Sequence, residues 1–369
     1  MRVAFVANTS WNIFNFRKGL VHSFLSNGHD VLILSPKDEY TEKVEGWGVQ
    51  WIDTPLKGTG LNPIEELKYL KRLYDAFKKS KPNVVLSYTI KPNIYSCLAA
   101  SLISIPVIAN VSGLGTIFLV DGFSGKIAKW LYRIAFRKAS YVFFQNHDDR
   151  ELFTTQISLA PSKVGLLPGS GIDLDEFPYE SPAFEGPVKF LMISRLIIEK
   201  GVQEYAEAAA EFVGDHNVEF TLVGRFDESH SRSIAKSNLN DWIERGYLEY
   251  YNHSNEIKEL ITSHEVVVLP SYREGTPRTL LEAASMGRPL LAADVPGCRE
   301  VVKNGLNGFL FEVKNARSLE SKIRLYLSLS KEERLELSKS SRKLVEEKFN
   351  EKLVIDAYHE VIRRITHET

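Results

Sequence analysis

Short apolar runs alternate with longer stretches of helical periodicity along the whole chain, and this alternation constrains the fold more than any other feature. The runs are rich in β-branched and aromatic residues, as the strands of buried parallel sheets are. They lie at 3–7, 31–35, 84–88, 107–111, 141–145 and 164–168, and again at 189–194, 219–224, 248–251, 266–270 and 290–294. Strands that alternate with helices indicate βαβ units, and these are too many strands for one sheet of ordinary size. The pattern therefore predicts an α/β protein with two Rossmann-like domains built on parallel sheets.

A division into two domains also suits the length of 369 residues. The segment YESPAFEGPVK at 179–189 carries two prolines and a glycine between the two series of strands, and we interpret it as the interdomain linker. We expect an N-terminal domain at 1–180 and a C-terminal domain at 181–349. The chain ends in a charged helical stretch, and we expect its last helix, at about 350–369, to pack back on the N-terminal domain.

Composition excludes several classes of protein. The 46 basic and 47 acidic residues balance, so no nucleic-acid partner is predicted. The two cysteines, Cys97 and Cys298, lie far apart and favour a reduced, cytoplasmic protein over a disulfide scaffold. The N-terminus, MRVAFVANTSW, enters a strand without a signal pattern, and no apolar stretch reaches the roughly eighteen residues of a membrane span.

Glu274 and Glu282 are the most informative pair of side chains. In SYREGTPRTLLEAASMG they follow the strand at 266–270, with Glu274 in a loop and Glu282 on the next helix. Open α/β sheets bind ligands at the carboxyl ends of their strands, and a helix N-terminus there offers amide groups to an anion. Carboxylates beside a phosphate site accept hydrogen bonds from hydroxyl groups. The segment thus suggests a phosphorylated sugar or a nucleotide as the ligand.

Two cations, Arg195 and Lys200, occupy the corresponding place after the strand at 189–194. Such a pair can hold a diphosphate, with Arg binding bidentately and Lys acting as a mobile point charge. Taken alone, an R-x4-K spacing is more often a solvated loop with two ordinary surface charges. The glutamate loop in the same predicted sheet favours the functional interpretation.

Three segments, SRLIIEKG, EGTPRTLLEA and LPGSGIDLDEF (167–177), together resemble the retaining family 4 glycosyltransferases of the GT-B fold. The resemblance covers nearly the whole chain and implies that the second domain binds a nucleotide-sugar. It further implies that Arg195 and Lys200 bind the diphosphate, that Glu282 binds the ribose hydroxyls and that Glu274 holds hydroxyls of the transferred sugar. Arg195, Lys200 and Glu274 are therefore the predicted catalytic residues.

The same resemblance implies further contacts to the donor. Pro277 has no N–H to donate, so amide contacts are expected from Arg278 and Thr279. Gly171, in the PGSG run, belongs to the predicted donor site. The loop around Asn252 to Ser254, including both of these residues, is expected near the base.

The first domain is expected to hold the acceptor. Polar residues that follow its strands would face the ligand if the sheet is parallel, and Arg17 and Lys91 are candidates for an acceptor diphosphate, with surface charges as an equally weighted alternative. Ser112 stands where many family members carry a His. The predicted acceptor-binding residues are Asn15, Arg17, Lys91, Ser112 and Gly113, with Asn12, Tyr88, Tyr95 and Gly115 nearby.

Three further segments, SYTIKPNIYS (87–96), NVSGLGTIF (110–118) and DVPGCREVV (294–302), resemble one branch of this family. That branch assembles bacterial glycans on polyprenyl-diphosphate carriers and includes N-acetylgalactosaminyltransferases. The expected activity is the transfer of an N-acetylhexosamine from a UDP-sugar to a lipid-linked saccharide. No cofactor is expected, and the DLD run at 173–175 is not interpreted as a metal site, because GT-B enzymes generally need no metal.

Two alternatives to a transferase remain open, namely a UDP-sugar epimerase of the same fold and a non-catalytic subunit that binds a nucleotide-sugar. A third open question concerns the segment KIAKWLYRIAFRK at 126–138, which has five basic residues and no acidic one. It is either a membrane-surface helix or a helix that packs on the core with a solvated basic face. With a lipid-linked acceptor, the first alternative predicts a peripheral protein at the inner face of the cytoplasmic membrane.

Overall fold

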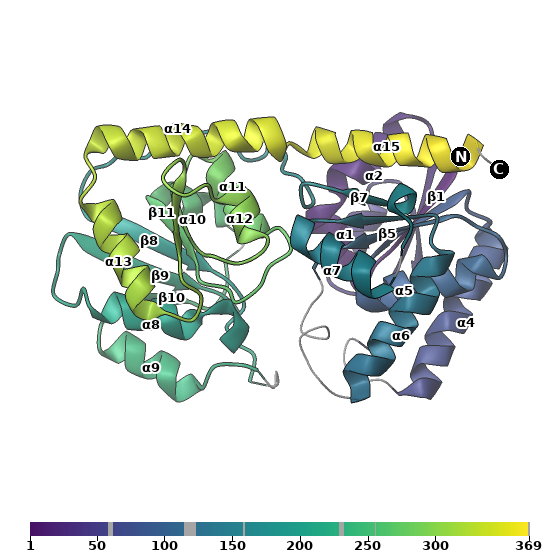
Figure 1. Ribbon diagram of the computed structural model, residues 1–369, viewed down its shortest axis with the longest axis horizontal. Helices are drawn as coiled ribbons and strands as arrows, with labels where there is room; N and C mark the ends of the chain where they lie inside the picture. Colours follow the sequence, from purple (N-terminus) through teal and green to yellow (C-terminus); the bar gives the residue numbers. More distant parts are fainter. Residues whose placement is uncertain (58–61, 114–122, 158, 229–231, 255, 368–369) are drawn as a thin grey trace. The chain divides into compact units, whose positions relative to one another are not determined.

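The computed structural model describes residues 1–57, 62–113, 123–157, 159–228, 232–254 and 256–367. It divides into two compact units. Unit 1 comprises Met1–Ser170 together with Glu351–Thr369, and unit 2 comprises Gly171–Asn350. Each unit is built on its own parallel sheet (Figure 1), which confirms the predicted α/β class with two Rossmann-like sheets.

The sheet of unit 1 has seven parallel strands in the order β3-β2-β1-β4-β5-β6-β7. Its strands are β1 (Arg2–Val6), β2 (Asp30–Ser35), β3 (Gln50–Asp53), β4 (Val84–Tyr88), β5 (Val107–Val111), β6 (Tyr141–Phe144) and β7 (Val164–Leu166). Its helices are α1 (Ser10–Phe16), α2 (Lys18–Ser26), α3 (Thr41–Glu45), α4 (Pro63–Ser80), α5 (Ile90–Ser101), α6 (Phe123–Lys138), α7 (His147–Ile157) and α15 (Glu351–His367), with a 3-10 turn at Pro161–Lys163.

Both faces of this sheet are buried, because alternate residues of each strand point to opposite sides. Val3 and Phe5 of β1 join a cluster that includes side chains of α2 and α15. Ala4 and Val6 join a second cluster, which α4, α5, α6 and α7 complete on the other face. The last helix of the chain is therefore part of the core of unit 1, and Tyr358 on it is fully buried.

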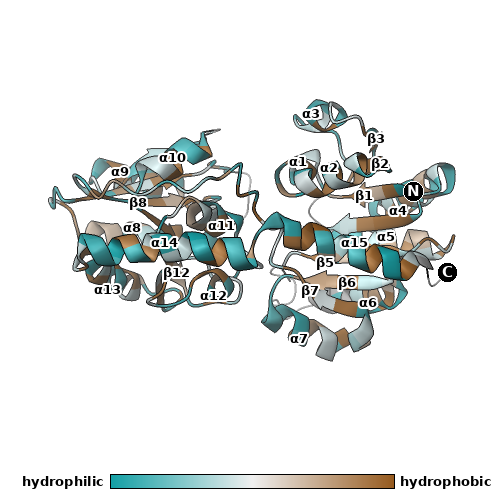
Figure 2. Ribbon diagram, turned by 90° about the horizontal axis from the view of Figure 1, so that it is seen from above, coloured by the Kyte–Doolittle hydropathy of each residue, from teal (hydrophilic) through white to brown (hydrophobic). Residues whose placement is uncertain are grey.

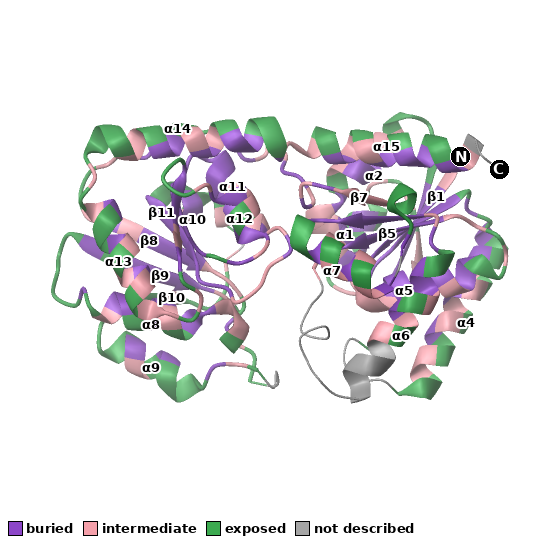
Figure 3. Cartoon of the chain, in the orientation of Figure 1, coloured by how far each residue is buried: buried purple, intermediate pink, exposed green. Residues whose placement is uncertain are grey.

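The sheet of unit 2 has six parallel strands in the order β10-β9-β8-β11-β12-β13. Its strands are β8 (Val188–Ile193), β9 (Val218–Val223), β10 (Glu249–Tyr251), β11 (Val266–Leu269), β12 (Leu290–Ala293) and β13 (Gly308–Phe311). Its helices are α8 (Val202–Ala210), α9 (Lys236–Glu244), α10 (Ile257–Ser263), α11 (Arg278–Ser285), α12 (Cys298–Val301), α13 (Ala316–Leu327) and α14 (Lys331–Lys348), with a 3-10 turn at Ile198–Lys200. Figure 3 shows the central strands of both sheets as buried, whereas β3, β7 and β10 at the sheet edges are partly exposed.

The two C-terminal helices have apolar and polar sides (Figure 2), but they belong to different units. In unit 2, α14 packs against α11 and begins with a capping box, in which the Ser330 side chain accepts a hydrogen bond from the Glu333 N–H and the Glu333 carboxylate accepts one from the Ser330 N–H. In unit 1, α15 packs against α2.

The structure differs from the sequence-based expectation in two strands and in one boundary. Both missed strands, β3 and β13, lie at sheet edges. β3 has polar ends and is only half buried, and β13 begins with a glycine. The units divide after Ser170 and not after residue 180. The proline-containing segment that suggested a linker lies inside unit 2, because Tyr179 packs against Gly287 and the Glu180 N–H bonds to the Met286 carbonyl.

Both sheets share one topological property that positions ligands. In each sheet the chain order reverses beside the first strand, between β1 and β4 in unit 1 and between β8 and β11 in unit 2. Ligands of open parallel sheets bind outside the carboxyl ends of the strands at this point, since the two loops diverge there and leave a crevice. The loops after β1, β4, β8 and β11 are therefore the places to look for a site.

Candidate active site

Lys200 and Glu274 meet at the switch point of unit 2. Lys200 ends the 3-10 turn after β8, Glu274 lies in the loop after β11, and their side chains form an ion pair. The two side chains are 21% and 13% exposed, so solvent screens their charges only in part. The sequence placed both residues at this sheet edge, and the structure brings them into contact.

Gly201 allows the two loops to approach so closely. It has a φ of 71°, and a Cβ at this position would overlap the backbone carbonyl of Pro270, just after β11. No other residue fits this conformation and this contact without strain. Gly297 has the same function behind the glutamate loop, since its φ is 82° and its Cβ would overlap the Gly275 carbonyl.

Cys298 lies near the ion pair and is fully buried. Burial raises the pKa of its thiol well above the usual value, and the nearby Glu274 carboxylate raises it further. A thiol with a raised pKa stays protonated and is a poor nucleophile. Cys298 is thus a packing residue of the site and not a covalent catalyst.

Helix α11 carries the second predicted carboxylate. Glu282 Oε1 pairs with Arg278 Nε at 2.9 Å, and the side chains are 16% and 19% exposed. Burial raises the pKa of Glu282, while the Arg278 guanidinium opposes that shift. Arg278 also donates from Nη1 to the carbonyl of Gly171 at 3.0 Å, which ties the start of unit 2 to the site.

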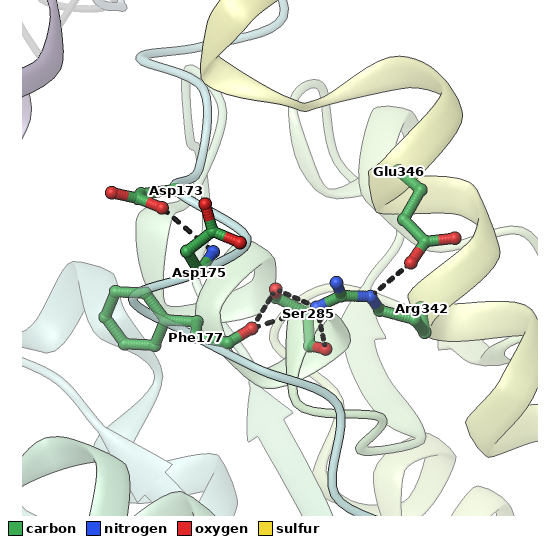
Figure 4. A network of polar contacts seen from close by, with 6 residues as sticks. All are labelled: Asp173, Asp175, Phe177, Ser285, Arg342 and Glu346. Atoms are coloured by element: carbon green, nitrogen blue, oxygen red, sulfur yellow. Dashed lines mark hydrogen bonds and ion pairs between the residues drawn. The ribbon is translucent and has the colours of Figure 1, made fainter.

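The segment that follows Gly171 is held by a network of polar contacts (Figure 4). Asp173 Oδ1 accepts hydrogen bonds from the N–H groups of Asp175 and Glu176 at 2.9 and 3.1 Å, so this carboxylate stabilises a local turn. Arg342 of α14 donates from Nη1 to the carbonyls of Phe177 and Ser285, both at 3.0 Å.

Sequence reasoning missed Arg342, because it lies in a charged helix with no local motif and meets its partners only in the folded unit. A weak signal was available in its spacing of four residues from Glu346, with which it forms an ion pair.

The remaining residues predicted for the donor are less tightly held. Arg195 is exposed, and its guanidinium has no hydrogen bond or ion pair within the described parts of the chain. Thr279 is the second residue of α11, whose first helical bond runs from the Leu280 N–H to the Pro277 carbonyl. Its amide therefore precedes the helical hydrogen bonds, where an anion can be bound.

The loop after β10 holds the two residues predicted near the base. Asn252 Oδ1 accepts from the Phe226 N–H at 3.2 Å and from the Tyr250 hydroxyl at 3.0 Å. Ser254 Oγ accepts from the Glu256 N–H at 3.0 Å. Both side chains shape this loop, and their contact with a base stays a prediction.

In unit 1 the two predicted cations have different environments. Lys91 forms an ion pair with Glu66 of α4 at 2.6 Å, and the side chains are 13% and 12% exposed. It also donates to the Lys57 carbonyl at 2.8 Å. Arg17, at the junction of α1 and α2, is only 3% exposed and lies 4.2 Å from the centroid of the Tyr88 ring. Among the described residues, Lys91 is already neutralised by a carboxylate, whereas Arg17 has only an aromatic face.

Three other predicted acceptor residues occupy loops and helix turns of unit 1. Asn15 Nδ2 donates to the Trp11 carbonyl at 2.9 Å within α1. Ser112 Oγ donates to Asn110 Oδ1 at 3.4 Å just after β5, and Gly113 follows with a φ of 143°. Gly115 lies outside the described residues.

Comparison with known proteins agrees with this geometry. The family of glycosyl transferases group 1 matches residues 174–344, and the glycosyl transferase 4-like family matches residues 2–146. The first match covers most of unit 2 and the second covers most of unit 1 up to the start of α7.

Two curated relatives are enzymes with closely related names. An N,N'-diacetylbacillosaminyl-diphospho-undecaprenol alpha-1,3-N-acetylgalactosaminyltransferase of Campylobacter jejuni is 30% identical over 359 residues, which are 92% of this chain and 93% of the relative. A UDP-Gal:alpha-D-GlcNAc-diphosphoundecaprenol alpha-1,3-galactosyltransferase of Escherichia coli is 28% identical over 276 residues, 69% of each chain.

Among solved structures, a glycosyltransferase from Rickettsia africae aligns with a TM-score of 0.82 at 17% identity and covers 100% of this chain and 99% of its own. At that identity the match establishes the fold alone. With the relative from Campylobacter jejuni, which matches over almost its full length, the chain belongs to the GT-B glycosyltransferases that combine a family 4-like domain with a group 1 domain.

Proposed function

We propose that this enzyme transfers an N-acetylhexosamine from a UDP-sugar to a saccharide linked to a polyprenyl diphosphate, with retention of configuration. The observation that carries the proposal is the Lys200–Glu274 ion pair at the switch point of unit 2. The Arg278–Glu282 pair on α11 follows Glu274 closely in sequence. The proposal is supported by the two curated relatives, whose names specify diphosphoundecaprenol-linked acceptors, and one of which names a UDP-sugar.

The ion pair suggests how the donor is bound. Without donor, the Glu274 carboxylate neutralises Lys200. The diphosphate of a UDP-sugar would replace Glu274 as the ion-pair partner of the Lys200 ammonium. Glu274 could then accept hydrogen bonds from sugar hydroxyls. Arg195 is exposed after the same strand and can contribute a second cation. Glu282, held in place by Arg278, would accept hydrogen bonds from the ribose.

The chemical step exchanges one bond of the anomeric carbon for another. The bond from this carbon to the β-phosphate oxygen breaks, and the oxygen of the acceptor hydroxyl bonds to the carbon on the same face. The hydroxyl proton passes to the departing diphosphate oxygen, whose negative charge Lys200 and Arg195 stabilise. The products are UDP and an acceptor longer by one sugar.

A lipid-linked acceptor also requires contact with a membrane surface, for which α6 is the candidate. Trp130 on this helix is 60% exposed and lies next to Lys129, while Arg133 and Arg137 are exposed farther along. Aromatic and basic side chains together favour the interface of an anionic bilayer. Tyr132 and Phe136 pack into the core of unit 1, so the helix also has a structural face. No described helix is long and apolar enough to cross a membrane.

A transfer assay tests the proposal. Purified protein is incubated with each of UDP-GalNAc, UDP-GlcNAc, UDP-Gal and UDP-Glc, with and without a short polyprenyl diphosphate that carries one N-acetylated sugar. We expect an extended lipid-linked product with one UDP-sugar and much less product from a Lys200→Ala variant. Conversion of the UDP-sugar without acceptor would instead indicate an epimerase. Binding of UDP without turnover of any pair would contradict enzymatic transfer and support a binding subunit.

A further inference from the structure

Arg17 is an unusual side chain for the interior of a protein. It is 3% exposed, yet its Nε and Nη1 are buried without a hydrogen-bond partner, and it forms no ion pair among the described residues. The Tyr88 ring at 4.2 Å stabilises the positive charge only in part. A buried charge without hydrogen bonds or a counter-ion is costly, so its presence calls for an explanation.

Three further buried polar atoms near this sheet edge have no hydrogen-bond partner within the described residues. They are Asn8 Oδ1 after β1, Asn12 Oδ1 on α1 and Thr89 Oγ1 after β4. β1 and β4 are adjacent, with Val6 opposite Ser87, so Asn8 and Thr89 both lie two residues beyond a paired position. This is the switch point of the unit 1 sheet, where a ligand is expected on topological grounds alone.

Thr89 adds a second kind of evidence. Its backbone has φ 71° and ψ 166°, a conformation that is essentially restricted to glycine and that costs other residues about 1–3 kcal/mol. It precedes α5 without making a side-chain capping bond, so the strain is not explained by the helix. Strained backbone of this kind concentrates where a structure holds a ligand.

Nearby carboxylates do not account for Arg17. Glu66 pairs with Lys91. The Glu351 carboxylate lies against Gly19 in the first turn of α2, where a Cβ would overlap it, but it is not an ion-pair partner of Arg17. The Arg17 guanidinium is therefore a buried positive charge without a carboxylate partner among the described residues of unit 1.

We infer that Arg17, with Asn8, Asn12 and Thr89, forms a pocket for a phosphate group, and that its ligand is the diphosphate of the lipid-linked acceptor. A guanidinium binds phosphate oxygens through two parallel hydrogen bonds, and this would satisfy its unpartnered nitrogens. Asparagine side chains can present either oxygen or nitrogen to a ligand, and the threonine hydroxyl can donate or accept. The identity of the ligand rests on the proposed function, whereas the affinity of the pocket for phosphate does not.

Binding of geranyl diphosphate in the presence of saturating UDP tests the inference, because UDP occupies the diphosphate site of unit 2. Titration calorimetry compares the wild type with Arg17→Met, Arg17→Lys and a control, Arg363→Met, which removes an exposed arginine of the same unit. We expect Arg17→Met to raise the Kd by about 10- to 100-fold, which corresponds to the loss of one or two hydrogen bonds to a charged group. Arg17→Lys should retain part of the affinity, and Arg363→Met should bind as the wild type does.

Thr89→Gly provides a second test that does not depend on the stability of an Arg17 variant. Glycine adopts the φ and ψ of this position without strain, so the variant should melt at the same or a higher temperature while it binds geranyl diphosphate more weakly. A purely structural Thr89 would give no loss of affinity. Inorganic diphosphate, titrated in parallel, shows whether the pocket recognises phosphate alone or needs the attached prenyl group.

The possible outcomes separate this inference from the proposed function. Equal affinity of Arg17→Met and Arg363→Met for geranyl diphosphate would overturn the pocket, even if the wild type transfers sugar. No binding by the wild type would overturn it as well. Loss of binding in Arg17→Met alone, in a protein that transfers no sugar, would support the pocket and contradict the proposed transferase substrate.

Discussion

Replacement of Arg278 by Met should lower the free energy of unfolding, because it leaves the buried Glu282 carboxylate without its partner. The two side chains form an ion pair four residues apart on α11, and both are largely buried. Removing one partner of a buried pair leaves an unpaired charge and costs about 3–5 kcal/mol, and the residual exposure of this pair places the expected loss near about 3 kcal/mol. For a unit of this size that corresponds to a melting temperature lower by about 6–12 °C.

Arg245→Met is the matched control, because Arg245 pairs with Asp241 at the same spacing on α9 with side chains 60% and 47% exposed. An exposed pair of this kind contributes only about 0.3–0.5 kcal/mol. Calorimetry or chemical denaturation of both variants therefore compares a buried ion pair with an exposed one at the same spacing. The Arg278 variant also loses the hydrogen bond to the Gly171 carbonyl. Equal destabilisation by the two substitutions would refute the reasoning.

The stability lost in the Arg278→Met variant should depend on pH. Burial raises the folded-state pKa of Glu282, and without the Arg278 guanidinium the pKa rises further. A carboxyl group whose pKa is raised in the folded state destabilises the fold when the pH is above that pKa, because the group is then charged. As the pH falls below that pKa the group becomes protonated, and the destabilisation is lost. The deficit of Arg278→Met should therefore be largest in mildly alkaline buffer and shrink in acidic buffer. A deficit that does not change with pH would show that lost packing, and not charge, is responsible.

The remaining predictions concern the other parts of the two units. Lys200→Ala should lower kcat/KM for the UDP-sugar by about 100- to 1000-fold in a steady-state assay, because it removes preorganised charge at the leaving group. Gly201→Ala should cost more than about 2 kcal/mol in thermal unfolding, since its Cβ overlaps the Pro270 carbonyl. Gly305→Ala has a similar φ but open space, so it should cost about 1 kcal/mol, and an equal loss would contradict the steric argument. Trp130→Ala should reduce sedimentation with anionic vesicles several-fold without changing transfer to a short-chain acceptor, and unchanged sedimentation would exclude α6 as the membrane contact.

The fold could be predicted to the extent that its strands are buried on both faces. Every strand in the middle of the two sheets has the apolar, β-branched character that the sequence shows directly. The edge strands β3 and β13 were not predicted. The sequence of β3, QWID, is half exposed, and that of β13, GFLF, contains a glycine with a φ of 153°. The boundary at Ser170 was not predicted for a different reason. Proline and glycine indicate a turn, but they do not indicate which unit the turn packs against.

The contact between Lys200 and Glu274 in unit 2 could be predicted because it follows from the order of the strands. Because β8 and β11 are adjacent, a cation after β8 and a carboxylate after β11 lie at the same sheet edge and can meet, as Lys200 and Glu274 do. Arg278 and Glu282 were assigned separate contacts with the donor, although a spacing of four residues on a helix predicts a mutual ion pair. Arg342 could not be found in this way, because its partners at Phe177 and Ser285 are distant in sequence.

Unit 1 shows why a cation in a loop is not enough to identify an anion site. Arg17 and Lys91 gave the same signal in the sequence, namely a basic residue shortly after a strand of the same sheet. They differ in the counter-charge, because α4 packs beside α5 and brings Glu66 to Lys91, whereas in the described part of the unit Arg17 has only the Tyr88 ring. At Lys91 an anion would have to displace Glu66 from a buried ion pair, at a cost of several kcal/mol. The Lys200–Glu274 pair differs in that the displaced Glu274 carboxylate is itself proposed to bind sugar hydroxyls. A buried cation that lacks a partner gains hydrogen bonds when an anion binds, so the counter-charge, which only the folded chain reveals, decides between the two.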